Sequence, residues 1–222
     1  MTPAVKLAEL ARSPHSAVRF RVAYNPNVTP AILHELVDDK SDVVRHAVAG
    51  HKETTVEDLL VLARDDYKYA RASVAWHARV PVPLLEVLSQ DEAAEVRAAV
   101  ACTVGTPIPV LRRLAEDVDA QVRQGVAANR STPGSVLATL ATDSFEGARF
   151  YAAINPGTPA SMLILLTRDD SEQVRRKART SAWKSPEIIA VLMGTADLAD
   201  IENSMRDKPH DLRAALGWPP EG

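Results

Sequence analysis

The sequence predicts an all-α fold, a right-handed α-solenoid of two-helix repeats. A Val-Arg or Ala-Arg pair recurs every 26 residues along the chain, and a fixed period of this size is typical of repeat architectures. Aromatic residues make up only 5% of the chain, which favours closely packed helices over sheets. The pairs are Val18-Arg19, Val44-Arg45, Ala70-Arg71, Val96-Arg97, Val122-Arg123, Ala148-Arg149 and Val174-Arg175.

Further columns of residues follow the same period. Two leucine columns run from Leu33 to Ile189 and from Leu36 to Leu192, an aspartate column runs from Asp39 to Asp169, and an alanine column runs from Ala23 to Ala153. The segment from Thr2-Pro3 to Ala11 matches the second half of one unit. We therefore expect about seven and a half repeats over residues 1–194, anchored at residues 18, 44, 70, 96, 122, 148 and 174. Residues 195–222 lose the period and are predicted to form a C-terminal helical cap.

Each unit is predicted to hold two short helices. Between Val122 and Gly147 the apolar residues follow helical spacing on both sides of a turn that contains Thr132-Pro133. We expect the threonine to cap the second helix and the proline to occupy its first position, as also at Thr106-Pro107 and Thr158-Pro159. Helices of two or three turns are unstable alone. Their stability must come from stacking on the neighbouring units.

The consensus of the unit resembles a known family. It reads Val-Arg-x-x-Val-Ala-x-Asn-Pro-x-Thr-Pro-x-x-x-Leu-x-x-Leu-Ala-x-Asp, best seen from Arg19 to Leu36 and from Arg149 to Leu166. Over about residues 2–194 it resembles the leucine-rich repeat variant family. The resemblance implies α-helices that alternate with 3₁₀ or short α-helices in a right-handed superhelix without strands. One member carries an N-terminal cysteine cluster with an iron–sulfur centre; this chain has only Cys102, so we expect no such cluster.

A second resemblance concerns the Asp-x-x-x-x-Val-Arg-x-x-Val/Ala spacing, as from Asp117 to Val126. This spacing is similar to that of HEAT repeats. The likeness implies an α-solenoid for protein binding, and one branch of that family is similar to DNA glycosylases. Fold-level likeness is a weak guide to function, so both possibilities stay open.

Composition and charge restrict the function classes. The net charge is −3 and the pI is about 6.1, so no global field attracts nucleic acid or an anionic membrane. The chain starts without a basic segment and apolar signal core, and it has no long apolar run. We therefore expect a cytoplasmic protein without a membrane span. No sequence motif of a hydrolase, phosphate-binding loop or zinc protease is present, so we expect no enzymatic activity and no cofactor.

The histidines have a structural explanation. His51 and His77 hold one repeat position at which other units carry Asn25, Asn129 and Asn155. An asparagine-like role in the turn explains both, because stacked units lie about 10 Å apart and shared ligation would require both side chains to stretch. We expect no metal site.

The arginine column has two possible interpretations. It could contact a phosphate backbone at regular intervals, or each arginine could join a column aspartate in a ladder of ion pairs and helix-end hydrogen bonds. We favour the ladder, because matched columns leave little net field. A separate basic group is formed by Arg175, Arg176, Lys177 and Arg179, which is either a solvated helix face or a patch for an anion, nucleic acid or acidic partner.

The outer side of the first helix in each unit is the main candidate site. Its positions are mostly small or aromatic instead of charged, which indicates either burial by neighbouring helices or a partner surface. The candidate anchors are Phe20, Tyr24, Trp76, Phe150 and Tyr151. The sequence therefore predicts a non-catalytic scaffold that binds a protein or peptide; the alternative is nucleic-acid binding or glycosylase-type DNA repair.

Overall fold

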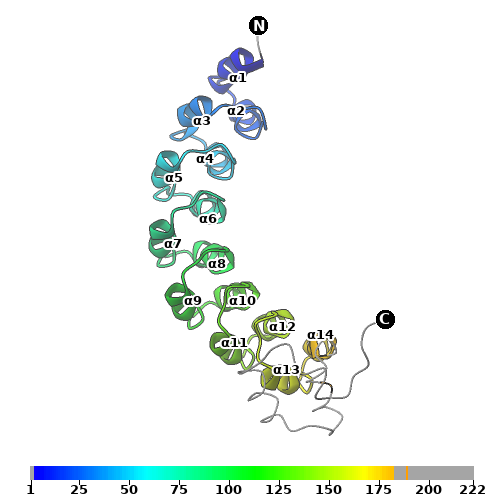
Figure 1. Ribbon diagram of the computed structural model, residues 1–222. Helices are drawn as coiled ribbons and strands as arrows, with labels where there is room; N and C mark the ends of the chain where they lie inside the picture. Colours follow the sequence, from blue (N-terminus) through cyan, green and yellow to red (C-terminus); the bar gives the residue numbers. More distant parts are fainter. Residues whose placement is uncertain (1–2, 183–188, 190–222) are drawn as a thin grey trace, which may run out of the picture. The chain divides into compact units, whose positions relative to one another are not determined.

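The computed structural model describes residues 3–182 and residue 189, and this part of the chain is helical without strands (Figure 1). It divides into two compact units, Met1–Ser131 and Thr132–Gly222, which are considered separately. The first unit contains α1 (Pro3–Ala11), α2 (Ser16–Ala23), α3 (Pro30–Leu36), α4 (Asp42–Ala49), α5 (Val56–Leu62), α6 (Lys68–Trp76), α7 (Val82–Leu88), α8 (Ala94–Cys102), α9 (Ile108–Leu114) and α10 (Ala120–Ala128). The second contains α11 (Gly134–Leu140), α12 (Glu146–Ile154), α13 (Ala160–Leu166) and α14 (Glu172–Ala182).

The helices of the first unit lie in two rows (Figure 1). The even-numbered helices α2 to α10 are the first helices of successive repeats, and the odd-numbered helices α1 to α9 are the second helices. The second unit has the same order of short helices. The predicted α-solenoid of two-helix repeats is confirmed, and the second elements are α-helices of seven residues from α3 to α13. The predicted cap over residues 195–222 lies outside the described residues.

The core follows the columns of the repeat. Leu59 and Leu111 of the second helices are fully buried, and so are Ala75 and Ala101 of the first helices. Burying each leucine stabilises the fold by about 1.5–3 kcal/mol. The alanines let consecutive first helices approach closely. Stacking of successive 26-residue repeats therefore buries the apolar columns that the sequence predicts.

The arginine and aspartate columns form the predicted ladder, which is confirmed. In five of the column arginines the Nε and Nη2 atoms donate to the two carboxylate oxygens of the aspartate 20 residues later, at 2.5–3.1 Å. These pairs, each inside one of the two compact units, are Arg19–Asp39, Arg45–Asp65, Arg71–Asp91, Arg97–Asp117 and Arg149–Asp169. Nη1 of Arg97 also donates to the carbonyl of Asp91, at 2.8 Å. Each arginine thus connects the starts of two successive first helices.

The ladder keeps its carboxylates ionised. Burial raises the pKa of Asp117, but hydrogen bonds from Arg97 and from the N–H of Asp119 outweigh this effect, so the pKa lies below its ordinary value. A carboxylate whose pKa is lowered by folding stabilises the native state above its unfolded pKa, and this stability is lost as the pH falls through the folded pKa. The ladder therefore supports the fold at neutral pH and weakens only in strong acid.

Two threonines of the turns, Thr106 and Thr158, do not act as predicted. We expected Thr106 and Thr158 to cap the second helices, but α9 and α13 begin one residue later, with Pro107 and Pro159 as the residues before the helix. The hydroxyl of Thr106 instead donates to the carbonyl of Val100, at 2.7 Å. The reason is that the last carbonyls of a helix lack intrahelical partners. The threonine therefore ends the first helix and does not start the second.

His51 and His77 take the predicted asparagine-like role in the turns. Nε2 of His77 lies 2.9 Å from the carbonyl oxygen of His51, and Nδ1 accepts the N–H of Arg79 at 3.1 Å. His51 makes the same contacts with the carbonyl of Asn25 and the N–H of Glu53. Asn129, two repeats after His77, makes the corresponding contacts: its side chain donates to the carbonyl of Thr103 and accepts the N–H of Ser131. These side chains connect each turn to the turn of the preceding repeat.

This arrangement predicts a loss of stability in mild acid. Burial lowers the pKa of His51, so the unfolded chain binds a proton more readily, and stability falls as the pH drops below about 6.5. Protonation also places a second N–H against that of Glu53 and costs on the order of 1 kcal/mol, the value of one hydrogen bond. We expect His51→Asn to lose less stability than wild type between pH 7.5 and pH 5, measured by urea unfolding. An equal loss in both proteins would contradict this role.

Candidate functional site

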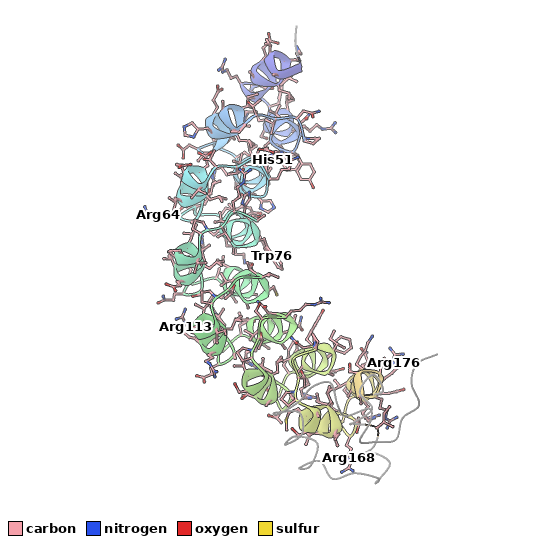
Figure 2. All side chains as sticks on the ribbon, in the orientation of Figure 1. His51, Arg64, Trp76, Arg113, Arg168 and Arg176 are labelled. Atoms are coloured by element: carbon pink, nitrogen blue, oxygen red, sulfur yellow. The ribbon has the colours of Figure 1, made fainter. Side chains whose placement is uncertain are left out.

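The first-helix row of the first unit carries three exposed aromatic side chains, and Tyr24 and Trp76 are more exposed than Tyr69. Tyr24, directly after α2, is 73% exposed, and Trp76, the last residue of α6, is 59% exposed. Phe20 is half-buried and its ring stacks against that of Tyr24, with 5.9 Å between the centroids. Figure 2 shows Trp76 on the side of α6 that faces away from the second-helix row. Large exposed aromatics are costly to leave in water and are typical of interface anchors.

Tyr24 and Trp76 alternate with small residues along one column of the repeat. Tyr24 and Trp76 are 52 residues apart, and the positions between and after them hold Gly50, Cys102 and Ala128. Each position is the last residue of a first helix or the residue directly after it. A large ring followed by a small residue leaves a notch between consecutive repeats.

Two pockets occupy these notches. The first has a volume of about 480 Å³ and the second about 310 Å³, which lie at the lower end of the range for ligand sites. The first is lined by Phe20, Tyr24, His46, Ala47, Gly50, His51, Lys52 and Ser73. The second is lined by Trp76, His77, Ala78, Val80, Val82, Leu85, Cys102, Thr103, Val104 and Gly105.

The electrostatics of the two pockets differ. The eight residues that line the first pocket include Lys52 and no carboxylate. The side chain of Lys52 is 73% exposed, and its Nζ lies 4.0 Å from Glu53, which also lies 3.9 Å from Nη2 of Arg79. Two cations therefore share one acid at the rim. The second pocket is lined mainly by apolar residues and by no Lys, Arg, Asp or Glu, and Val104, one of its lining residues, is 80% exposed.

An aromatic cluster at the start of α6 was not predicted from the sequence. The rings of Tyr67 and Tyr69 meet edge-on at 5.2 Å, and the Tyr67 ring meets that of His46 at 6.2 Å. Nδ1 of His46 contacts the carbonyl of Tyr69 and the hydroxyl of Ser73, both at 3.0 Å. The signal was present in Tyr67-Lys-Tyr69, since other repeats carry few aromatics at these positions. The cluster holds His46 in place at the edge of the first pocket.

The second unit contains the other two predicted anchors. Phe150 and Tyr151 of α12 are both half-buried, and their rings meet edge-on at 5.5 Å. Nζ of Lys177 in α14 lies 5.8 Å from the centroid of the Phe150 ring, a distance that allows a cation–π contact. These aromatics therefore offer less free surface than Tyr24 and Trp76.

The predicted basic group lies on α14. Nη1 of Arg175 donates to the carbonyls of Asp169 and Asp170, at 2.6 and 2.8 Å, so Arg175 acts as a column arginine. Arg176 and Arg179 are exposed; Figure 2 labels Arg176 on α14. Two exposed guanidinium groups one turn apart, together with Lys177, form a small cationic face.

Within residues 3–182 no group of three or more histidine, cysteine or acidic side chains is arranged to hold a metal ion. Burial raises the pKa of the free thiol of Cys102, which lowers its reactivity as a nucleophile. In the same part of the chain, no helix combines the length and the apolar composition that a membrane span requires.

Comparison with known proteins agrees with the repeat geometry. No protein-family model and no curated protein matches the chain. A solved structure described as a leucine-rich repeat variant with a novel repetitive structural motif aligns with 27% identity over 81% of this chain and 72% of that chain, with a TM-score of 0.60. The chain resembles the leucine-rich repeat variant. This confirms the resemblance predicted from the consensus of the unit.

A second solved structure resembles the chain in fold. The Escherichia coli protein YibA aligns with 16% identity over 94% of this chain and 93% of that chain, with a TM-score of 0.55. At this identity the likeness concerns the fold alone. Together with the leucine-rich repeat variant, it supports a helical repeat solenoid, an architecture that presents extended surfaces for binding.

Proposed function

We propose that this protein is a non-catalytic scaffold that binds another protein or a peptide on the first-helix row of its first unit. The observation that carries the proposal is the exposure of Tyr24 and Trp76 beside two pockets on that row. Solenoids in general use the surface of stacked repeats for binding. The proposal includes the cytoplasmic location expected from the sequence.

The electrostatics of the row support binding over catalysis. The ladder arginines and aspartates are engaged with one another, and the turn histidines hold backbone groups. The pockets are instead lined mainly by aromatic, aliphatic and small side chains and by turn histidines, with the ammonium group of Lys52 exposed at the rim. Such a surface gains binding energy from apolar burial at a few anchors.

The proposal is tested by affinity purification from the native host followed by mass spectrometry, with wild type, Trp76→Ala and Tyr24→Ala compared. Both residues are exposed, so the variants should unfold as wild type does, while each truncated anchor weakens partner binding by about 2 kcal/mol or more, roughly thirtyfold. Val118→Ala, at a side chain that is 94% exposed, is the control. Equal recovery of the same partners by all four proteins would contradict the proposal.

Nucleic-acid binding, with glycosylase-type repair as one form, is the second candidate, favoured by the exposed Arg176 and Arg179 with Lys177 on α14. Neutralising about three phosphates gives a slope near −3 in a plot of log K against log salt. A salt titration with duplex DNA measures this slope, and Arg176→Gln/Arg179→Gln should reduce it by about 2. No binding at low salt would eliminate this candidate.

A further inference from the structure

The two pockets of the first-helix row are equivalent in the repeat. Four lining positions of the first pocket recur in the second at a spacing of 52 residues, which is two repeats. The matched pairs are Tyr24 and Trp76, Gly50 and Cys102, His51 and Thr103, and Lys52 and Val104. The solenoid therefore presents the same kind of notch twice, with one repeat between.

The spacing of the notches defines the length of an occupant that fills both. Packed helices lie about 8–10 Å apart, so two repeats correspond to about 16–20 Å. An extended chain advances about 3.3–3.6 Å per residue, so about five or six residues cover this distance. An α-helix is about 10–12 Å wide, as wide as one repeat, and would rest on the rings of Tyr24 and Trp76. An extended chain can enter the notches.

Gly50 keeps the first notch open, although the fold does not require a glycine there. Its φ of −88° and ψ of −5° are available to any residue. A Cβ at this position would meet no atom closer than the His46 carbonyl oxygen, at 3.8 Å. Gly125 of α10 is different, because a Cβ there would lie 3.0 Å from Ala101 and Cys102. A side chain at Gly50 would enter the pocket without disturbing the core.

The charged residues at each notch indicate which side chains of a bound partner would fit there. Lys52 lines the first pocket, which has no carboxylate, and Arg21 is exposed between Phe20 and Tyr24 on α2. Val104 takes the place of Lys52 in the second pocket. The first pocket therefore favours an occupant that carries an acid next to its apolar anchor. The second pocket, which no Lys, Arg, Asp or Glu lines, favours an apolar anchor without an adjacent charge.

We propose that the two pockets bind one extended peptide segment, which carries an apolar side chain next to a carboxylate and a second apolar side chain about five or six residues away. This inference rests on the proposed function and names the class of partner for the same surface. The carboxylate pairs with Lys52, the first anchor enters beside Tyr24 and Gly50, and the second packs against Trp76 and Val104.

A library of displayed random peptides of about 16 residues, selected on the whole chain, tests the proposal. We expect the enriched peptides to share an acid beside an aromatic or large aliphatic residue and a second apolar residue at the stated spacing. A synthetic peptide of the enriched sequence is then measured by fluorescence anisotropy. Gly50→Leu fills the first notch and Trp76→Ala removes the wall of the second, so each should weaken binding about tenfold or more.

The matched control is Ala128→Leu, an exposed position two repeats after Trp76 in the same column, which should bind within about twofold of wild type. Lys52→Gln should weaken acidic peptides and leave their amide analogues unchanged. Enriched peptides without a fixed spacing, helical peptides with anchors about eleven residues apart, or equal binding by Gly50→Leu and Ala128→Leu would overturn this inference. If Trp76→Ala and Tyr24→Ala still weaken binding in those cases, the proposed function stands. A library without any binder overturns this inference, while the proposed function is decided by the recovery of partners with Trp76→Ala and Tyr24→Ala.

Discussion

Asp117→Ala is expected to destabilise the first unit by about 3–5 kcal/mol, because it leaves a buried charge without its partner. Arg97 is only 15% exposed and donates two hydrogen bonds to Asp117, at 2.7 and 2.9 Å. The substitution also removes the acceptor for the N–H of Asp119. Urea unfolding at pH 7, followed by circular dichroism, measures the change in the free energy of unfolding.

The matched control is Glu95→Ala, which breaks the pair of Glu95 with Lys68, an ion pair between successive repeats whose side chains are 46% and 40% exposed. We expect a cost below about 1 kcal/mol, because exposed pairs are screened by solvent. The double variant Arg97→Met/Asp117→Leu should recover most of the loss, since it removes both buried charges. If Asp117→Ala costs no more than Glu95→Ala, the ladder is not a major support of the fold.

Gly125→Val is expected to destabilise the first unit by about 3 kcal/mol, because α10 packs against α8 without room for a side chain. A Cβ at Gly125 would lie 3.0 Å from the Ala101 Cβ and the Cys102 Sγ, and 3.2 Å from the backbone oxygen of Ala98. The backbone oxygen cannot move aside as a flexible side chain can. The free energy of unfolding, measured in urea, checks this prediction.

Gly50→Ala provides the contrast for that experiment. The position is exposed and its surroundings are open, so a methyl group should stabilise the chain by about 0.4–1 kcal/mol through the unfolded state. A similar effect of the two substitutions would contradict the close packing of α8 and α10. It would also remove the reason to regard Gly50 as a residue retained for the pocket.

Much of the fold could be predicted because equivalent positions in successive repeats lie in the same structural environment. The invariant period places Leu59 and Leu111 in one core column, and it pairs each arginine with an aspartate at a constant distance along the chain. A side-chain choice that recurs at one position has one physical cause in all units. His51 and His77 were predictable on the same basis, since asparagine occupies their position elsewhere.

The threonine contacts and the pockets could not be predicted, because they depend on distances between atoms that the aligned repeat sequences do not give. The Thr106 hydroxyl reaches a carbonyl at the end of the preceding helix, and only the backbone geometry of the turn decides between that carbonyl and the next helix. The anchors Tyr24 and Trp76 were predicted, but the pockets arise from small neighbours such as Gly50, whose importance lies in the space that it leaves. Phe150 and Tyr151 were predicted by the same reasoning, and contacts within the second unit partly cover them.

The central claim is that the first-helix row, and not the outer side of the second-helix row, receives the partner. It is tested most directly by installing a photo-crosslinking residue at Gly50 in one variant and at Val87 in another, and irradiating cells of the native host. Val87 lies on α7 and is 65% exposed, so both positions are accessible. We expect a crosslinked partner through position 50 and none through position 87. Crosslinking through position 87 alone, or equally through both, would contradict it.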